Sequence, residues 1–447
     1  MSINVLVADD SAYLRKNIAD ILKGHNLIKI LEFAKNGEEA VALVKKYRPD
    51  VLVLDLVMPK MNGLEAFKLI MEDCPTPTVI LSAISPKNLD SSIQALLMGA
   101  FDYIIKPGGI GAKELPMFRE ELLAKVLLAS QSQIKKLFRK EGETYKKSMT
   151  LRQEIIDEIF NFGQYLNRLQ PLEETEEDKE TQIIDIGKAK VISRKKTQKL
   201  VKKETAEKES NKGKARKTKK KAVIDQPTKS DYPTKFIKEK PKFVPNLTPV
   251  KGMVLRSNVV VIGASVGGPR TITTILKELP GNLVVPILIV QHLSSHFTQA
   301  FVDNLDIECN LRIKVAINGE ALQPGVCYIA PGDKHMEIGV ENKRPFIKIY
   351  KGTPVNFCLP SIDVLFFSVA RVYKERAMGI ILTGMGSDGV EGLGAIKNSG
   401  GNTIAESEET SILYAMPKFA AEKGFANLIL PNHNISEQII RFASPHK

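Results

Sequence analysis

A serine, a histidine and an aspartate in the C-terminal half of the chain have the residue types and positions of a nucleophilic catalytic site. Ser265 lies in GASVG, which fits the pattern G-x-S-x-G, where flanking glycines permit a sharp turn that exposes the serine hydroxyl. A serine nucleophile needs a base within hydrogen-bond reach, and a histidine base needs an acceptor that fixes its tautomer. His292 and Asp388 each follow an apolar, strand-like run, so we expect all three side chains at one edge of a parallel sheet. This arrangement predicts acyl-transfer chemistry.

Other interpretations of the same residues stay open from the pattern alone. The glycines also resemble the dinucleotide fingerprint G-x-G-x-x-G, but Ser265 stands where the second glycine belongs. His335, in APGDKHM, is a rival base, and His296 is a weaker one. The order Ser, His, Asp differs from the Ser, Asp, His order of α/β-hydrolases, which argues against that fold. A structural glycine turn beside a histidine that serves only the fold is as compatible with the pattern as catalysis.

Three carboxylates form a second candidate site near the N-terminus. Asp9 and Asp10 end one apolar run, and Asp55 ends another. In a parallel sheet these ends converge, and clustered carboxylates are costly unless a hard cation lies between them. Mg²⁺, which prefers oxygen ligands and retains waters, fits such a site.

A hydroxyl and an ammonium group are expected beside these carboxylates. Ser82 and Lys106 end two further apolar runs. Both could contact the oxygens of a phosphoryl group carried by Asp55. A haloacid-dehalogenase-type phosphatase would need a second aspartate two residues after Asp55, but the chain has Val57 there.

Apolar runs alternate with helical patterns at both ends of the chain, and these elements must position the candidate residues. Residues 1–125 have four runs typical of buried parallel strands: INVLVADD, DVLVLD, PTVILS and FDYIIK. Helical patterns begin there near Ser11, Glu38, Gly63 and Leu89. In residues 257–443, strands are predicted at VVVIGAS, VPILIVQH and MGIILTG, helices after Pro269, Ser361 and Gly392, and hairpins at VCYIAPGDKHMEIG and RPFIKIYKG. The fold class is therefore α/β, with two doubly wound domains.

The segment between these domains has a different composition. Residues 126–170 are predicted to be a helical extension, with an apolar stripe over 155–169 that packs on its own domain or forms a short coiled-coil seam. Residues 171–256 are predicted to be a disordered linker. Residues 187–256 hold 23 Lys and Arg against six Asp and Glu, so they account for the net charge of +13. We expect a solvated spacer, although acidic partners, anionic lipids or nucleic acid could bind it.

Composition excludes several classes of protein. No apolar run among the 447 residues approaches the roughly 20 residues of a membrane-spanning helix, and the acidic N-terminal stretch MSINVLVADD is no signal peptide. The four cysteines form no CxxC pair and have no histidine at ligand spacing, so a structural zinc site is not expected. We expect a reduced, cytoplasmic protein.

The N-terminal motifs VADDS, DLVMPKMNGLEA, LSA and YIIKP resemble the response-regulator receiver family across residues 1–125. The resemblance implies a flavodoxin-like (βα)5 domain with Asp55 as the phosphoacceptor. It also implies Mg²⁺ bound by Asp10, Asp55 and the Val57 carbonyl, with Asp9 assisting. Ser82 and Lys106 would respond to phosphorylation, and Tyr103 matches the aromatic switch position.

The C-terminal motifs VIGASVGGP, VQHLS, APGDKHM, PSIDVLF and LTGMGSDG occur in this order over residues 257–443 and resemble the catalytic domain of chemotaxis protein-glutamate methylesterases. The resemblance implies Ser265 as nucleophile, His292 as general base and acid, and Asp388 as the group that orients His292. The backbone N–H groups of Val266 and Met385 would form the oxyanion hole. No cofactor is implied in this domain.

Three features depart from that family's usual pattern. Val266 stands where threonine is usual, Ala415 stands where glycine is common before Met-Pro, and the linker is longer and more basic.

The resemblance implies hydrolysis of glutamate γ-methyl esters on chemoreceptors, with deamidation of receptor glutamines as a second activity. A chemotaxis histidine kinase would be the phosphodonor, and the unphosphorylated receiver would cover the hydrolase site. The alternative is a receiver with a non-catalytic output domain that binds nucleic acid or acidic partners through the lysine-rich linker.

Overall fold

The structure is a computed structural model that describes residues 2–83, 85–107, 114–138, 245, 248, 255 and 257–444. The predicted apolar stripe at 155–169 and nearly all of the predicted linker at 171–256 lie outside the described residues.

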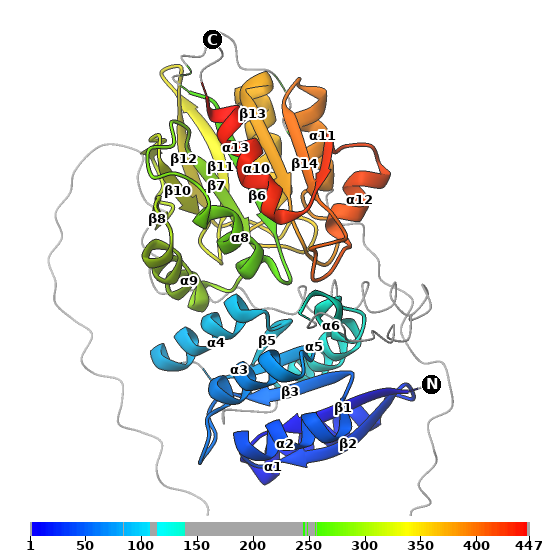
Figure 1. Cartoon of the computed structure of the whole chain (residues 1–447). Helices are drawn as coiled ribbons and strands as arrows, with labels where there is room; N and C mark the ends of the chain where they lie inside the picture. Colours follow the sequence, from blue (N-terminus) through cyan, green and yellow to red (C-terminus); the bar gives the residue numbers. More distant parts are fainter. Residues whose placement is uncertain are drawn as a thin grey trace, which may run out of the picture. The chain divides into compact units, whose positions relative to one another are not determined.

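The first domain contains a five-stranded parallel sheet in the order β2-β1-β3-β4-β5 (Figure 1). Its strands are β1 Ile3–Ala8, β2 Ile28–Ala34, β3 Val51–Asp55, β4 Thr78–Ser82 and β5 Asp102–Ile105. Every residue of β3 and β4 is buried, which explains their unbroken apolar sequences. β2 was not among the four predicted runs, because this edge strand has exposed and half-buried residues that break its apolar run.

Helices α1 to α4 of this domain begin at side-chain caps that the sequence supplies. They are α1 Ala12–Lys23, α2 Gly37–Tyr47, α3 Gly63–Asp73, α4 Pro86–Met98, α5 Glu114–Ala129 and α6 Ile134–Leu137. Ser11, Asn36, Asn62 and Ser85 each accept a hydrogen bond from a backbone N–H three residues later. The four predicted helices are confirmed.

The second domain contains a seven-stranded sheet in the order β15-β14-β13-β6-β7-β10-β8, with all neighbouring strands parallel (Figure 1). Its strands are β6 Val259–Ala264, β7 Ile287–Gln291, β8 Arg312–Val315, β10 Val326–Ile329, β13 Ala377–Ile381, β14 Asn402–Glu406 and β15 Leu428–Leu430. The prediction of a doubly wound parallel sheet is confirmed.

The central strand β6 decides where a site can form. It lies between β7, the next strand in the chain, and β13, which arrives more than 100 residues later. The strand order therefore reverses at β6, and the carboxyl ends of β6, β7 and β13 are neighbours. Such a reversal is where open α/β sheets bind ligands.

One prediction in this domain was wrong. Val326–Ile329, expected in a hairpin, forms β10 and pairs in parallel with β7 and β8. The rest of the predicted hairpin is confirmed, because β11 His335–Glu341 and β12 Arg344–Tyr350 pair antiparallel, and β9 Glu320–Ala321 extends them into a separate three-stranded sheet. All four residues of β10 are buried. So short an apolar run has no periodicity that would distinguish a buried parallel strand from one strand of a hairpin.

Helices complete the second domain. They are α8 Gly268–Lys277, α9 Ser295–Glu308, α10 Ile362–Tyr373, α11 Val390–Asn398, α12 Met416–Glu422 and α13 Ile435–Ala443. The helices predicted after Pro269, Ser361 and Gly392 correspond to α8, α10 and α11. Across the part of the chain that is described, no helix has the length and apolar character needed to span a membrane.

Candidate active site and phosphorylation site

Ser265 lies at the turn between β6 and α8 and is half-buried. Its N–H donates to the Thr383 carbonyl oxygen at 3.1 Å, and its own carbonyl oxygen accepts from Gly268 N at 2.9 Å. Gly267 adopts a left-handed conformation with φ 76°, which glycine tolerates without strain. Within the described residues, Ser265 Oγ has no hydrogen-bond partner. The turn is thus fixed through its backbone, while the hydroxyl stays free.

Neighbouring strand ends hold this turn from both sides. The Gln291 side chain at the end of β7 donates to the Ser265 carbonyl oxygen at 2.9 Å. On the other side, Thr383 Oγ1 donates to the Val266 carbonyl oxygen at 3.0 Å. Thr383 N in turn donates to the buried Glu406 at 2.8 Å. Gln291, Thr383 and Glu406 were not singled out from the sequence, because no motif marks them as supports of this turn.

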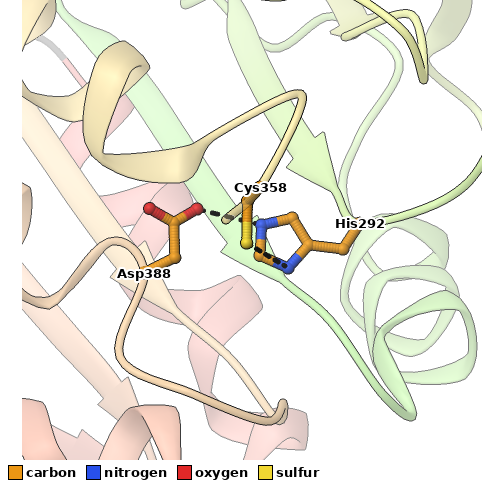
Figure 2. Close-up of side chains that lie close together, drawn as sticks. All are labelled: His292, Cys358 and Asp388. Carbon is orange, nitrogen blue, oxygen red and sulfur yellow. Dashed lines mark hydrogen bonds and ion pairs between the residues drawn. The ribbon is translucent and has the colours of Figure 1, made fainter. Parts of the chain in front are cut away.

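His292 and Asp388 are brought together as predicted. His292 directly follows β7, and its backbone N–H donates to the Ala264 carbonyl oxygen at 3.0 Å. His292 Nε2 lies 2.9 Å from Asp388 Oδ2 (Figure 2). The His292 side chain is 16% exposed and that of Asp388 only 2%. Solvent can therefore reach the imidazole of the pair but hardly its carboxylate.

The Asp388 carboxylate accepts hydrogen bonds from the segment that starts α10. Ser361 Oγ donates to Oδ1 at 2.7 Å, Ile362 N donates to Oδ2 at 2.6 Å, and Asp363 N lies 3.3 Å from Oδ1. Burial by itself would raise the pKa of Asp388, but the hydrogen bonds and charge of His292, with the bonds from Ser361 and Ile362, lower it below its ordinary value. An ionised Asp388 is what orients and stabilises an imidazolium.

A second buried carboxyl, Asp363, lies beside Asp388. Asn356 Nδ2 bridges the two, at 2.5 Å from Asp363 Oδ2 and 3.0 Å from Asp388 Oδ1. Gly392 N donates to the other Asp363 oxygen at 2.7 Å. Burial, and then the charge of Asp388, raise the pKa of Asp363 to about 8. The negative charge of the pair at neutral pH therefore resides on Asp388.

The rival histidines have other environments. His335 is buried, its Nδ1 accepts from Ser361 N at 3.2 Å, and its Nε2 lies 3.1 Å from the Thr353 carbonyl oxygen. Both ring nitrogens are thus used within the protein, and burial lowers the pKa of His335. His296 is exposed at the start of α9. His335 supports the segment that holds Asp388 and is not a free base.

The two predicted oxyanion-hole residues follow loops that meet at Ser265. Val266 is the next residue in the chain, and Met385 follows Gly384. A Cβ at position 384 would lie 2.6 Å from Ser265 Cβ, so only glycine allows this approach. Met416 N donates to the Gly384 carbonyl oxygen at 3.2 Å, which ties the start of α12, directly after Ala415, to the same loop.

Sequence reasoning missed Cys358 beside the catalytic candidates. Its Sγ lies 3.8 Å from His292 Nδ1, and Figure 2 shows the thiol and the Asp388 carboxylate both pointing at the imidazole ring. Burial, with the charges of Asp388 and Asp363, raises the pKa of the Cys358 thiol well above its ordinary value. Its neighbourhood in the chain, NFCLP, contains no other potential ligand and so gave no signal.

In the first domain, the three predicted carboxylates gather at the ends of β1 and β3. One oxygen from each of Asp9, Asp10 and Asp55 lies within 4.8 Å of the others. Lys106 Nζ lies 2.9 Å from Asp9 Oδ2 and 2.6 Å from Asp55 Oδ2. Burial raises the pKa of Asp55 to about 6, although Lys106 opposes this effect.

The donor set of this cluster fits a hard divalent cation. It offers only carboxylate oxygens, of which those of Asp9 and Asp55 are buried while Asp10 is exposed. Two buried carboxylates served by a single lysine leave an excess of negative charge that Mg²⁺ would neutralise. Asp9, Asp10 and Asp55 would hold the ion, and Lys106 contacts two of these three carboxylates.

Ser82 and Tyr103 lie on the two adjacent strands, β4 and β5. Ser82 ends β4 and its Oγ accepts from Ser92 Oγ at 2.8 Å, a contact within the domain that the sequence did not indicate. Tyr103, in β5, is buried, and this burial raises its pKa to about 12.

Comparison with known proteins agrees with this architecture. The family model for the response regulator receiver domain matches residues 5–114, and that for CheB methylesterase matches residues 260–439. A protein-glutamate methylesterase/protein-glutamine glutaminase of Archaeoglobus fulgidus is 32% identical over 446 residues, which cover 98% of this chain and 97% of the relative. The chain belongs to this family.

Two comparisons with Thermotoga maritima extend this finding. The protein of that species with the same name is 30% identical, with 98% of each chain covered. The crystal structure of the Thermotoga maritima CheB methylesterase catalytic domain is 39% identical and covers 42% of this chain and 99% of its own, with a TM-score of 0.41.

Contacts join the receiver and methylesterase domains, whose described residues belong to one compact unit. Ser294 N donates to Tyr103 Oη at 3.2 Å, and the Tyr103 and Phe297 ring centroids are 4.0 Å apart. Asn304 Nδ2 donates to Asp90 Oδ1 at 3.0 Å, between α9 and α4. The predicted switch residue Tyr103 thus contacts a residue two positions after His292.

Proposed function

We propose that the protein is a phosphorylation-regulated protein-glutamate methylesterase that also deamidates glutamine. Family membership over nearly the whole chain supports the reaction class. The structural observation that carries the proposal is the His292–Asp388 pair at 2.9 Å, beside an unengaged serine hydroxyl at the neighbouring strand end.

In the proposed mechanism, Ser265 Oγ attacks the γ-acyl carbon of a glutamyl methyl ester while His292 takes the hydroxyl proton. Asp388 engages Nε2, so Nδ1 is the nitrogen left to accept this proton. The backbone N–H groups of Val266 and Met385 would stabilise the oxyanion. His292 returns the proton to the departing methoxide, which leaves as methanol. Water then hydrolyses the acyl-serine by the same route, and a glutamine substrate would release ammonia instead.

In the receiver, Asp55 is proposed as the phosphoacceptor. Asp9, Asp10, Asp55 and the Val57 carbonyl would hold Mg²⁺, which supplies charge neutralisation for the incoming phosphoryl group. Ser82, Lys106 and Tyr103 would then respond to phosphorylation. The Tyr103 contact with Ser294 supports a route by which that response reaches His292.

The proposed substrates are cytoplasmic segments of chemoreceptors, and the proposed phosphodonor is a histidine kinase of the same chemotaxis pathway. The reaction requires no contact with the membrane interior, and we place the protein in the cytoplasm.

The decisive test is methanol release from methylated receptor membranes, with and without a small-molecule phosphodonor. We expect Ser265→Ala to reduce release by more than about 10³-fold, since the nucleophile is lost. The exposed Ser444→Ala serves as the control and should leave release unchanged. Unchanged release by Ser265→Ala would reject the proposed nucleophile and favour a non-catalytic output domain.

A further inference from the structure

The Cys358 thiol has no role in the proposed hydrolysis, yet it lies against the residues that perform it. One ligand atom from each of His292, Cys358 and Asp388 lies within 4.8 Å of the other two. Figure 2 shows the three side chains converging on one small region. His292 and Cys358 are both partly exposed, so an ion can reach them from solvent.

An imidazole, a thiolate and a carboxylate are the ligand types that zinc prefers. Zinc sites with three protein ligands and one open position are common, and the softer thiolate and imidazole groups disfavour Mg²⁺ and Ca²⁺. With zinc–ligand bonds of about 2.0–2.3 Å, a tetrahedral ion holds its ligand atoms about 3.3–3.6 Å apart. Ligand atoms that lie within 4.8 Å of one another must therefore approach by up to about 1.2–1.5 Å to reach this geometry.

Two of the three ligands are held in place by their own backbone and hydrogen bonds. Val355 and Cys358 exchange both backbone hydrogen bonds, at 3.1 and 2.9 Å, across a tight turn. The central residues Asn356 and Phe357 have φ values of 51° and 64°, as a type I′ turn requires. Asp388 is fixed by hydrogen bonds from the Ser361 hydroxyl and the Ile362 backbone N–H. Apart from the contraction of the cluster, the main adjustment is a rotation of the His292 ring, so little conformational freedom is lost when an ion binds.

We propose that His292, Cys358 and Asp388 form a Zn²⁺ site, and that zinc bound there inhibits the hydrolase. Binding releases the Cys358 thiol proton to solvent and uses the imidazole nitrogen that would otherwise take part in proton transfer. Ser265 then keeps its proton and cannot attack the ester. The inhibition rests on the proposed function, whereas zinc binding does not.

Metal binding is measured on the full chain in excess Mg²⁺, which fills the acidic receiver cluster. Zn²⁺ is titrated by calorimetry, and Co²⁺ reports thiolate ligation through a sulfur-to-metal charge-transfer band. We expect Cys358→Ser to lose the band and to weaken zinc binding by more than about 100-fold. Loss of a residue that only hydrogen-bonds to a metal ligand already lowers metal affinity by about 10–100-fold, and Cys358 would be a ligand itself. Cys358→Ala, as a second variant, should do the same. Cys309→Ser, which changes a half-buried cysteine outside the cluster, should behave as the unmodified protein.

The second arm measures methanol release with and without zinc. We expect zinc to inhibit the unmodified protein and Cys309→Ser by at least about tenfold, and Cys358→Ser to escape this inhibition. A charge-transfer band that persists in Cys358→Ser, or equal zinc inhibition of both variants, would overturn the proposal. If the protein releases no methanol at all, the proposed function fails, while the calorimetric and spectroscopic results still decide whether the zinc site exists.

Discussion

At the scale of single residues, the unusual feature of the catalytic domain is the number of groups devoted to one carboxylate. Asp388 accepts from His292, Asn356, Ser361 and the backbone of α10, and its neighbour Asp363 carries a raised pKa of about 8. This environment concentrates the negative charge on Asp388, where it can stabilise a protonated His292.

Ser361→Ala tests this interpretation. The change removes the 2.7 Å hydrogen bond to Asp388 Oδ1 and should lower kcat by about 10–100-fold with little effect on KM, since hydrogen bonds to charged groups contribute about 1.5–3 kcal/mol. The matched control is Ser368→Ala, a buried serine of the same helix that contacts Leu365 and Ile338 instead. Equal kcat values for the two variants would mean that Ser361 serves only the fold.

The candidate catalytic residues at the strand ends could be predicted from the sequence, but the residues that contact and support them could not. Ser265, His292 and Asp388 each follow an apolar run of recognisable length, so their convergence followed from the geometry of a parallel sheet. Asn356 and Cys358 lie in a turn of irregular backbone, where no periodicity indicates which way a side chain points. Glu406 ends a strand that was not predicted.

At the scale of secondary-structure elements, the turn that holds Ser265 depends on β14 as well as on β6. Glu406 ends β14, where it accepts from Thr383 N and from Thr410 Oγ1 at 2.8 Å each. Burial raises the pKa of Glu406 from 4.5 to about 7, against the opposing effect of these hydrogen bonds. The strand end therefore carries a carboxyl group that titrates near neutral pH.

Glu406→Gln should change how stability depends on pH. Between about pH 4.5 and 7 the folded protein binds this proton more tightly than the unfolded chain, so rising pH lowers the free energy of unfolding, by on the order of 2–3 kcal/mol in total. The amide preserves the acceptor for Thr383 and removes the titration. Urea unfolding between pH 5 and about pH 8 should show a flatter dependence for Glu406→Gln than for the exposed control Glu408→Gln. Parallel pH dependences for the two variants would contradict this assignment.

At the scale of the whole molecule, the receiver and the hydrolase share an interface that includes the predicted switch residue. Tyr103 contacts Ser294 and Phe297, and Asp90 accepts from Asn304 of α9. Because α9 begins three residues after His292, displacement of this interface would act close to the proposed catalytic base.

Asn304→Asp should weaken the interface by placing a like charge opposite Asp90. At the observed 3.0 Å contact the repulsion costs on the order of 1 kcal/mol or more, so methanol release without a phosphodonor should rise about fivefold. Adding Asp90→Asn should restore the original rate. Asp303→Asn, on the same helix and paired with Gln299 instead, is the control. Unchanged basal release in Asn304→Asp would mean that this contact does not restrain the enzyme.

The position of Asp388 has a consequence for the stage of folding at which the site can form. Its carboxylate accepts from N–H groups at the start of α10. Asp388 therefore caps a helix that begins more than 20 residues earlier in the chain. The cap forms only when the loop after β13 has docked on that helix, and in the folded protein β13 is paired with β6. Newly synthesised or partly opened chains therefore present serine, histidine and aspartate as separate, inert side chains. Hydrolytic competence is therefore expected only once this loop, the start of α10 and the central strands are in place together.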